Sequence, residues 1–295
     1  MSLGIPYMGS KRKLAPDILS FITSRHIGIT DFYDLFGGGG SVSFCAIKDH
    51  RFKTHYNELN DHIYHLVKYL KSNRELGAKF YEWVTREEFF KQCARTDADW
   101  YSGFVMSCWS FGNKQSSYIY GADIEELKRL AHQFVVFGCL DSMKKLGLDI
   151  PTLLDIKDIQ KRRIVFCDYV GNRIQNLERV SMIEHLSRIQ NLQNLQITNL
   201  SYENVIISGE NPIIYCDIPY KGTVVYHGDA FHYDRFYQWF GDLEYPAYLS
   251  EYAAPFKEVT AFRHRSSLSA TNNGKKTIEK LFWNGKGNIT HFKLF

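Results

Sequence analysis

The first residues that could do chemistry lie between Asp34 and Ser41, where the sequence reads DLFGGGGS. Four consecutive glycines there separate an apolar strand pattern from a helical pattern. Such a loop allows a tight turn whose backbone contacts a bound nucleotide, with the N–H groups of the following helix pointing toward it. A flexible glycine-rich loop is the plain alternative. The nucleotide interpretation is favoured because the next strand pattern ends at Glu58, where an acid can accept both hydroxyls of a ribose.

The glycine spacing limits which nucleotide this could be. Ser43 stands three residues after Gly40, so the G-x-G-x-x-G pattern of dinucleotide sites is not followed. The expected ligand therefore contains adenosine but need not carry a pyrophosphate. Near the N-terminus, in YMGSKRK, Tyr7 and Lys11 combine an aromatic ring and a cation that could close over the same adenosine pocket. A solvated helix start is the alternative for this segment.

A second chemical segment is DIPY, in which Asp217, Ile218, Pro219 and Tyr220 follow an apolar strand pattern. Functional groups of open α/β sheets lie at the carboxyl ends of the strands. A carboxylate acceptor beside an aromatic face suits a flat ring that bears an amine, such as a nucleobase. Taken alone, the segment is more typical of a strand followed by an ordinary proline-containing turn.

The elements that must position these residues follow from the hydrophobic pattern. Short strand patterns cover 29–36, 52–59, 195–207 and 212–220. From about residue 65 to 190 the pattern changes to amphipathic helices, at 86–94, 123–147 and 176–192. We therefore expect an α/β domain made of residues 1–64 and 191–295, with a helical domain inserted at 65–190.

Composition excludes several classes of protein. The 295 residues are 44% hydrophobic and 23% charged, which is typical of a soluble globular chain, and no apolar run is long enough to cross a membrane. The start lacks a signal peptide, so we expect a cytoplasmic protein. The six scattered cysteines predict neither a disulfide nor a metal site. The formal net charge of +4 is concentrated at the two ends of the chain.

The order of the motifs is more specific than any one of them. YMGSK, DLFGGGGS, NELN, a helical insert, NLSY and DIPY follow one another along the chain, and together they resemble the Dam-like family of DNA N6-adenine methyltransferases. The resemblance covers nearly the whole chain. It implies a Rossmann-like S-adenosylmethionine-dependent methyltransferase fold, with the helical insert as a target recognition domain. It also implies S-adenosylmethionine as cofactor, double-stranded DNA as substrate and a bacterial or phage origin, and it leaves open a cognate restriction endonuclease as partner.

The resemblance also implies roles for individual residues. In the family, the matching positions contact the cofactor or shape its loop, and here they are Tyr7, Lys11, Asp34, Phe36, Gly38, Gly40, Ser41, Glu58, Tyr202 and Asp217. Asp217 and the carbonyl of Ile218 would accept hydrogen bonds from the adenine N6 amine, and Tyr220 would stack on the flipped base. The family's D-P-P-Y is DIPY here, which keeps the carbonyl but loses one proline restraint. N4-cytosine methylation, or a catalytically weak DNA-binding homologue, are the alternatives.

A base-flipping enzyme must also hold a duplex, largely through its phosphates. The polar segment 109–118 is the expected reader of base edges, because amide and lysine side chains suit that task. A one-sided basic hairpin around 262–276 is the second expected contact. A plain loop is the alternative for the first segment, and a solvated surface hairpin is the alternative for the second. The DNA-binding residues predicted from these two segments are Asn113, Lys114, Gln115, Arg263, Arg265 and Lys275.

Overall fold

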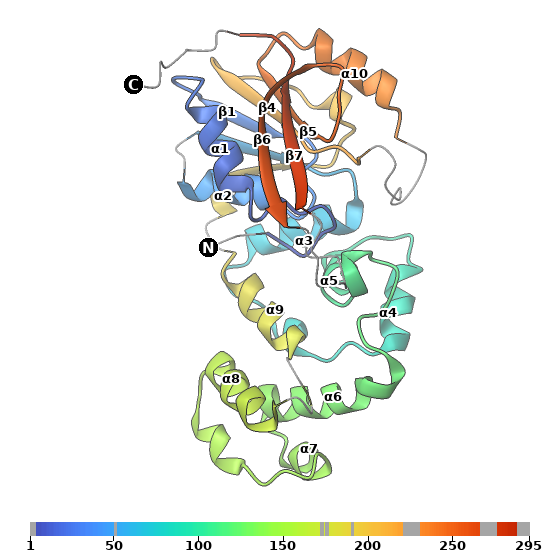
Figure 1. Cartoon of the computed structure of the whole chain (residues 1–295). Coiled ribbons are helices and arrows are strands. Elements are labelled where there is room, and N and C mark those ends of the chain that lie inside the picture. The colour runs from blue at the N-terminus through green and yellow to red at the C-terminus, as the bar shows by residue number, and fades with distance from the viewer. Residues whose placement is uncertain are drawn as a thin grey trace.

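The computed structural model describes residues 4–49, 52–171, 174, 177–189, 192–220, 231–265 and 276–287. In these ranges the strands form a seven-stranded sheet of order β3-β2-β1-β4-β5-β7-β6 (Figure 1). The neighbours from β3 to β5 are parallel, whereas β7 is antiparallel to β5 and to β6. The strands are β1 Asp31–Asp34, β2 Lys53–Asn57, β3 Leu195–Thr198, β4 Pro212–Cys216, β5 Ala247–Glu251, β6 Lys257–Arg265 and β7 Lys276–Trp283.

The central strands are buried on both faces, as their apolar sequence requires. Along β1, Phe32 belongs to the hydrophobic cluster beneath α1 (Ala15–Thr23) and α2 (Ser41–Asp49). The next residue, Tyr33, belongs to the cluster beneath α10 (Tyr233–Asp242) on the opposite face. Successive side chains of a strand point to opposite faces, so one continuous apolar run serves both layers.

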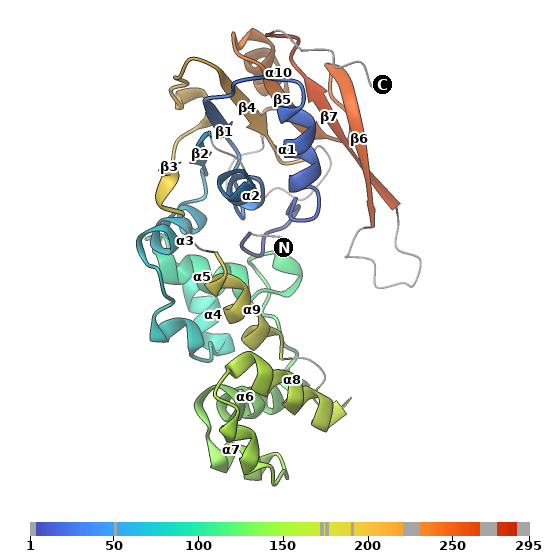
Figure 2. The same ribbon diagram turned by 90° about the vertical axis from the view of Figure 1, so that its left-hand side faces the viewer.

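The remaining helices form a block at one end of the sheet (Figures 1 and 2). One hydrophobic cluster joins the first and last of them to the sheet, and a second cluster holds the far end together. The predicted domain boundary at residue 64 falls within α3. The helices of the block are α3 Asp61–Ser72, α4 Arg86–Cys93, α5 Trp100–Cys108, α6 Ala122–Phe137, α7 Leu140–Lys145, α8 Ile159–Val170 and α9 Glu178–Ser187.

Local sequence explains where these helices begin and end. The Asn60 side chain accepts hydrogen bonds from the N–H groups of His62 and Ile63, which caps α3. The single helical pattern predicted at 123–147 is two helices, because Gly138 takes a left-handed conformation (φ +71°) that ends α6. No described helix is long and apolar enough to cross a membrane.

Candidate active site

The candidate site lies where the strand order reverses, at the carboxyl ends of β1 and β4. The parallel register pairs Asp34, the last residue of β1, with Tyr215 of β4. Asp217 therefore follows directly beside the glycine loop that leaves β1. Such a switch point is where open α/β sheets bind their ligands. The two segments singled out in the sequence are thus brought together by the fold.

The glycine loop is tightly packed rather than flexible. A Cβ atom at Gly37 would lie 2.2 Å from the ring of Tyr56, and one at Gly39 would lie 2.4 Å from the carbonyl oxygen of Ile5. The N–H of Ile5 also donates to the carbonyl of Gly39 at 2.7 Å, which fixes the N-terminal segment against the loop. These close approaches require glycine at both positions.

Glu58 accepts two backbone hydrogen bonds, one from the glycine loop and one from the start of α3. Its Oε2 accepts from the N–H of Gly38 at 2.6 Å, and its Oε1 accepts from the N–H of Asn60 at 2.8 Å. The residue is only 8% exposed, and burial raises the pKa of its carboxyl group. The ring of Tyr7 lies against Gly38. The carboxylate is therefore held at the loop with its lone pairs available to a further donor.

Asp34 is a buried carboxyl with one unsatisfied oxygen. Oδ2 accepts a hydrogen bond from the Ser43 hydroxyl at 2.6 Å, whereas Oδ1 has no hydrogen-bond partner among the described residues. Burial raises the pKa of Asp34 to about 7. An acceptor without a partner in such a place is costly unless a ligand supplies a donor. A ligand ammonium group would satisfy this oxygen and favour its charged form.

The raised pKa of Asp34 predicts a pH-dependent stability. The folded protein keeps this proton up to about pH 7, whereas the unfolded chain loses it near 3.8. Because the folded state binds more protons in this window, the contribution of Asp34 to stability falls as the pH rises from about 4 to 7. Neutral Asp34→Asn should therefore melt at a higher temperature than the wild type at pH 8, and at a similar one at pH 4. The same difference in melting temperature between Asp34→Asn and the wild type at every pH would contradict this prediction.

Asp217 is surrounded by residues from three separate parts of the chain. Lys11 Nζ lies 2.8 Å from Asp217 Oδ1 and 3.5 Å from Oε1 of Glu279, which is on β7. The hydroxyl of Tyr220 donates to Glu279, and Lys11 Nζ lies 4.7 Å from the centre of the Tyr220 ring. Burial raises the pKa of Asp217 to about 6, against the opposing effect of Lys11. The cluster joins a carboxylate acceptor, a cation and an aromatic face at one point.

An aromatic cluster adjoins the same loop. The ring of Phe36, two residues after Asp34, lies 5.4 Å from that of Tyr202 and 5.9 Å from that of Phe231. Tyr202 also contacts Trp239 of α10, with the ring centres 4.7 Å apart. These rings can pack against an apolar or aromatic part of a ligand.

The other predicted residues of the site have structural contacts. The hydroxyl of Ser41, at the start of α2, lies 2.7 Å from that of Ser10 and joins the N-terminal segment to the helix. Ile218 is buried in the cluster under α10, and the carbonyl of Pro219 accepts a hydrogen bond from Tyr233 at 2.9 Å. Gly40 has a left-handed φ of +74°. The segment DIPY is thus anchored to α10.

The predicted DNA-binding residues that the structure describes lie in two places, at the turn after α5 and on β6. Asn113 and Gln115 have left-handed φ values of 58° and 59° in a tight turn. Lys114 is exposed, whereas Gln115 is buried, with its oxygen 3.5 Å from Asn60 Nδ2. The polar loop expected here is closed by a bridge between Ser110 and Tyr118.

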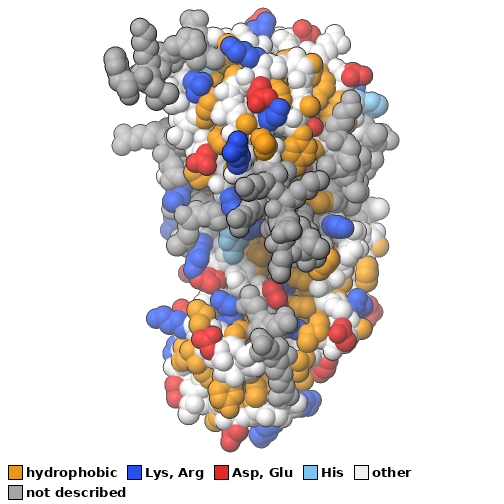
Figure 3. Space-filling view, in the orientation of Figure 1, with side chains coloured by type: hydrophobic (Ala, Val, Ile, Leu, Met, Phe, Trp, Pro, Cys, Tyr) orange, Lys and Arg blue, Asp and Glu red, His pale blue; other side chains and the backbone are white. Residues whose placement is uncertain are grey.

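The predicted basic hairpin is present as the antiparallel pair β6 and β7. Arg263 is exposed on β6, the side chain of Arg265 is outside the described part of the structure, and Lys275 lies outside the described residues. Figure 3 shows basic and acidic side chains mixed over one face of the sheet and the helical block.

One residue of the Asp217 cluster, Glu279, was missed in the sequence. Glu279 and the buried Leu281 are two residues apart on β7, so their side chains face the same side of the strand. An acid at a position where the strand pattern expects an apolar residue was the signal that the sequence offered. Phe111, which lies inside the predicted segment 109–118, is 65% exposed at the turn that carries Asn113.

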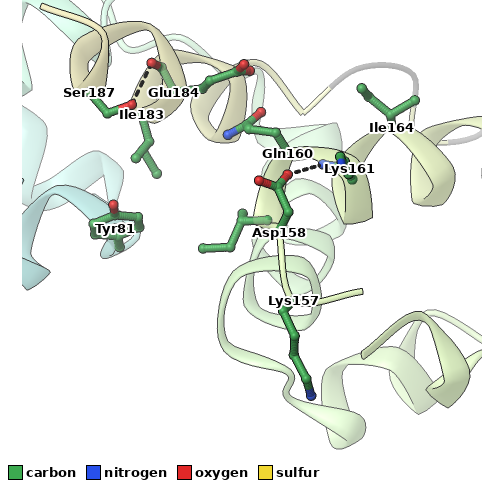
Figure 4. Close-up of a pocket in the computed structure, with 10 residues that line it drawn as sticks. Tyr81, Lys157, Asp158, Gln160, Lys161, Ile164, Ile183, Glu184 and Ser187 are labelled. Atoms are coloured by element: carbon green, nitrogen blue, oxygen red, sulfur yellow. Dashed lines mark hydrogen bonds between the residues drawn. The ribbon is translucent and has the colours of Figure 1, made fainter. Parts of the chain in front are cut away.

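A separate hollow lies in the helical block between α8 and α9 (Figure 4). Its charged side chains include Asp158, which accepts a hydrogen bond from the N–H of Lys161 and thereby caps α8. Tyr81 and Ile183 line it as well. It shares no residue with the cluster around Asp217. No group of His, Cys, Asp or Glu side chains within the described ranges is arranged to hold a metal ion.

The sheet order and the loop after β1 define a Rossmann-like fold of the kind used by S-adenosylmethionine-dependent methyltransferases. Residues 7–104, about a third of the chain, match the sequence model of the family described as D12 class N6 adenine-specific DNA methyltransferase. This match confirms the predicted fold class, and over these residues the chain is similar to adenine-specific DNA methyltransferases. The match includes Lys11, the glycine loop and Glu58, and it stops before Asp217. No curated protein matches the chain.

Proposed function

We propose that the protein transfers the methyl group of S-adenosylmethionine to N6 of an adenine flipped out of duplex DNA. The observation that supports this most is the position of Asp217, which lies beside Tyr220 and next to the loop that follows β1. The carboxylate is the acceptor that an exocyclic amine needs, and the ring is the surface on which a flat base stacks. The family match supports the same reaction class.

The residues around the glycine loop fit the chemical groups of S-adenosylmethionine. Glu58 would accept the ribose hydroxyls, since its carboxylate is already fixed by Gly38. Asp34 would accept the methionine amine through Oδ1, the oxygen without a hydrogen-bond partner. Phe36 and Tyr202 would pack on the adenine of the cofactor. Tyr7 and Lys11 would close the pocket from the N-terminal segment, Ser41 would complete the loop, and Gly38 and Gly40 would keep it close to the ligand.

The chemistry of the target base then depends on Asp217 and Ile218. When bound, the cofactor supplies an electrophilic methyl group on a sulfonium. The Asp217 carboxylate and the Ile218 carbonyl accept the two N6 hydrogens, which directs the nitrogen lone pair toward that methyl group. The methyl group would pass to N6 as the sulfonium sulfur leaves as a neutral thioether, and the N6 proton would pass through the Asp217 carboxylate to solvent. Pro219 restrains the turn, and Tyr220 holds the ring by stacking.

The helical block would supply target recognition. In this proposal residues 1–64 and 191–295 form the catalytic domain and residues 65–190 the recognition domain. Asn113 and Lys114 are accessible for base edges, and the exposed Phe111 could stack between bases at the same turn. Because Gln115 is buried, its role would be to hold the turn rather than to contact DNA directly.

The basic hairpin predicts a salt-dependent contribution to DNA binding. Combining Arg263→Ala with Lys275→Ala should weaken binding about equally for all sequences and reduce the slope of log K against log salt by about 2, roughly one per lost phosphate contact. Fluorescence anisotropy at several salt concentrations measures this. Lys53→Ala, an exposed lysine on β2 in the other half of the sheet, is the matched control. An unchanged slope in the double variant would remove the hairpin from the interface.

A transfer assay tests the proposed function. The protein is incubated with labelled S-adenosylmethionine and either unmethylated genomic DNA or a duplex made only of guanine and cytosine. We expect label in the genomic DNA and none in the adenine-free duplex. Equal label in the two substrates would contradict adenine as the target.

A further inference from the structure

Glu279 is a buried carboxylate that the proposed mechanism does not use. It is 2% exposed, on a strand that is distant in sequence from both chemical motifs. Tyr220 donates its hydroxyl proton to Glu279, and Lys11 Nζ lies 3.5 Å away. Both of these polar contacts tie Glu279 to residues that surround Asp217.

The charges in this cluster do not balance. Asp217 and Glu279 share the single ammonium group of Lys11, which lies 2.8 Å from the first and 3.5 Å from the second. Burial alone would lower the pKa of Lys11, but the two carboxylates outweigh it and raise that pKa. The ammonium therefore stays charged between two competing acceptors. Its position can shift by a side-chain movement alone, because a lysine has three rotatable donors.

The contact between Lys11 and Asp217 bears directly on the proposed reaction. In the structure, Asp217 Oδ1 already accepts a hydrogen bond from Lys11. A base amine that approaches the same oxygen must compete with this ammonium. Glu279 is close enough to take the ammonium over, and Lys11 also donates to the carbonyl of Gly9 at 3.2 Å, which keeps it near both carboxylates.

We propose that Glu279 is a positioning residue for methyl transfer, with two tasks that rest on the proposed function. It holds the hydroxyl of Tyr220, which sets the orientation of the ring on which the base stacks. It also accepts the ammonium of Lys11 when the adenine amine reaches Asp217, so that Oδ1 is free to accept the N6 hydrogen. Glu279 touches neither base nor cofactor in this account and acts through Tyr220 and Lys11.

Two substitutions separate the two tasks. Glu279→Gln keeps an oxygen that can accept from Tyr220 but removes the charge that attracts Lys11. Glu279→Asp keeps the charge but shortens the side chain, which breaks the contact with Tyr220. Single-turnover transfer to unmethylated genomic DNA should slow at least tenfold in the glutamine variant, with the affinity for S-adenosylmethionine within twofold of the wild type. Glu258→Gln, a half-exposed glutamate on the neighbouring strand, is the matched control and should transfer at the wild-type rate.

A pH profile provides a readout that a merely structural role would not change. The negative charge of Glu279 contributes to the raised pKa of Asp217, after burial and against Lys11. Removing that charge lowers the pKa of Asp217. The fall in transfer rate at low pH should therefore begin at a lower pH in Glu279→Gln than in the wild type, and at the same pH in Glu279→Asp. The groups that face Asp217 and bear on this limb are Lys11, Asp34, Tyr215, Cys216, Tyr220, Tyr252 and Glu279.

The outcomes separate this inference from the proposed function. Wild-type rates and an unmoved acid limb in Glu279→Gln, with an active wild type, would overturn the inference and leave the function standing. A wild type that transfers nothing would overturn the function. In that case the pKa of the Asp217 carboxyl group, measured by carbon NMR, decides the inference. An Asp217 pKa that is the same in Glu279→Gln as in the wild type would overturn it. A second test uses Glu279→Asp, in case the glutamine variant does not fold.

In Glu279→Asp we expect weaker stacking of a 2-aminopurine placed at the target position, because the contact with Tyr220 is lost. Unchanged stacking would overturn the inference.

Discussion

Replacing Asp217 by alanine is expected to lower the single-turnover rate of methyl transfer by roughly 10²–10³-fold, the usual effect of removing one preorganised polar partner of a transition state. The carboxylate is the acceptor that directs the lone pair of the adenine amine in the proposed mechanism. Its loss also leaves Lys11 with Glu279 as the carboxylate partner. Rapid-quench measurement of labelled methyl groups in DNA gives the rate.

The control for this experiment is a matched aspartate outside the site. Asp242→Ala, at the exposed end of α10, should transfer at the wild-type rate. Calorimetry should show that Asp217→Ala still binds S-adenosylmethionine, which separates loss of chemistry from loss of cofactor. Equal rates for the wild type and Asp217→Ala would contradict a catalytic role for this carboxylate.

Replacing Glu58 by alanine is expected to weaken the binding of S-adenosylmethionine by about 10–100-fold. A hydrogen bond to a charged group contributes about 1.5–3 kcal/mol, and the substitution removes the acceptor proposed for the ribose hydroxyls. It also leaves the N–H groups of Gly38 and Asn60 without their carboxylate partner, which loosens the loop. Isothermal titration calorimetry with the cofactor alone measures the change in Kd.

Two further variants show whether the effect is specific to Glu58. Glu58→Gln keeps one carbonyl acceptor and should bind the cofactor with intermediate affinity. Glu87→Ala, an exposed glutamate of α4, should leave Kd unchanged. An unchanged Kd in Glu58→Ala, with melting temperature also unchanged, would remove this residue from the cofactor site.

Much of the sheet and half of the site were predictable because their signals are local. Strand β1, the glycines after it and the helix capped by Asn60 are specified by neighbouring residues. The same holds for β4 and the DIPY segment. The parallel order of β1 and β4 then brings Asp34 and Asp217 together, as the sequence pattern indicated.

The parts that were not predicted depend on contacts between distant segments. Glu279 reaches Tyr220 only because β7 inserts between β5 and β6 in antiparallel register, which no local pattern specifies. Gln115 is buried because its turn folds toward Asn60. Gly138 ends α6 and divides the segment 123–147 into two helices, although its hydrophobic pattern is continuous. The pattern alone does not show such a break. In each case the deciding partner lies on another element or in the backbone conformation.

The most direct test of the central claim is the identity of the modified base. Unmethylated genomic DNA is incubated with S-adenosylmethionine and wild-type protein or Asp217→Ala, digested to nucleosides and analysed by mass spectrometry. The account predicts N6-methyladenine with the wild type and a strongly reduced amount with the variant. N4-methylcytosine in place of N6-methyladenine would contradict adenine as the target. No methylated nucleoside from a wild type that binds both cofactor and DNA would contradict catalysis and leave a DNA-binding protein with the same fold.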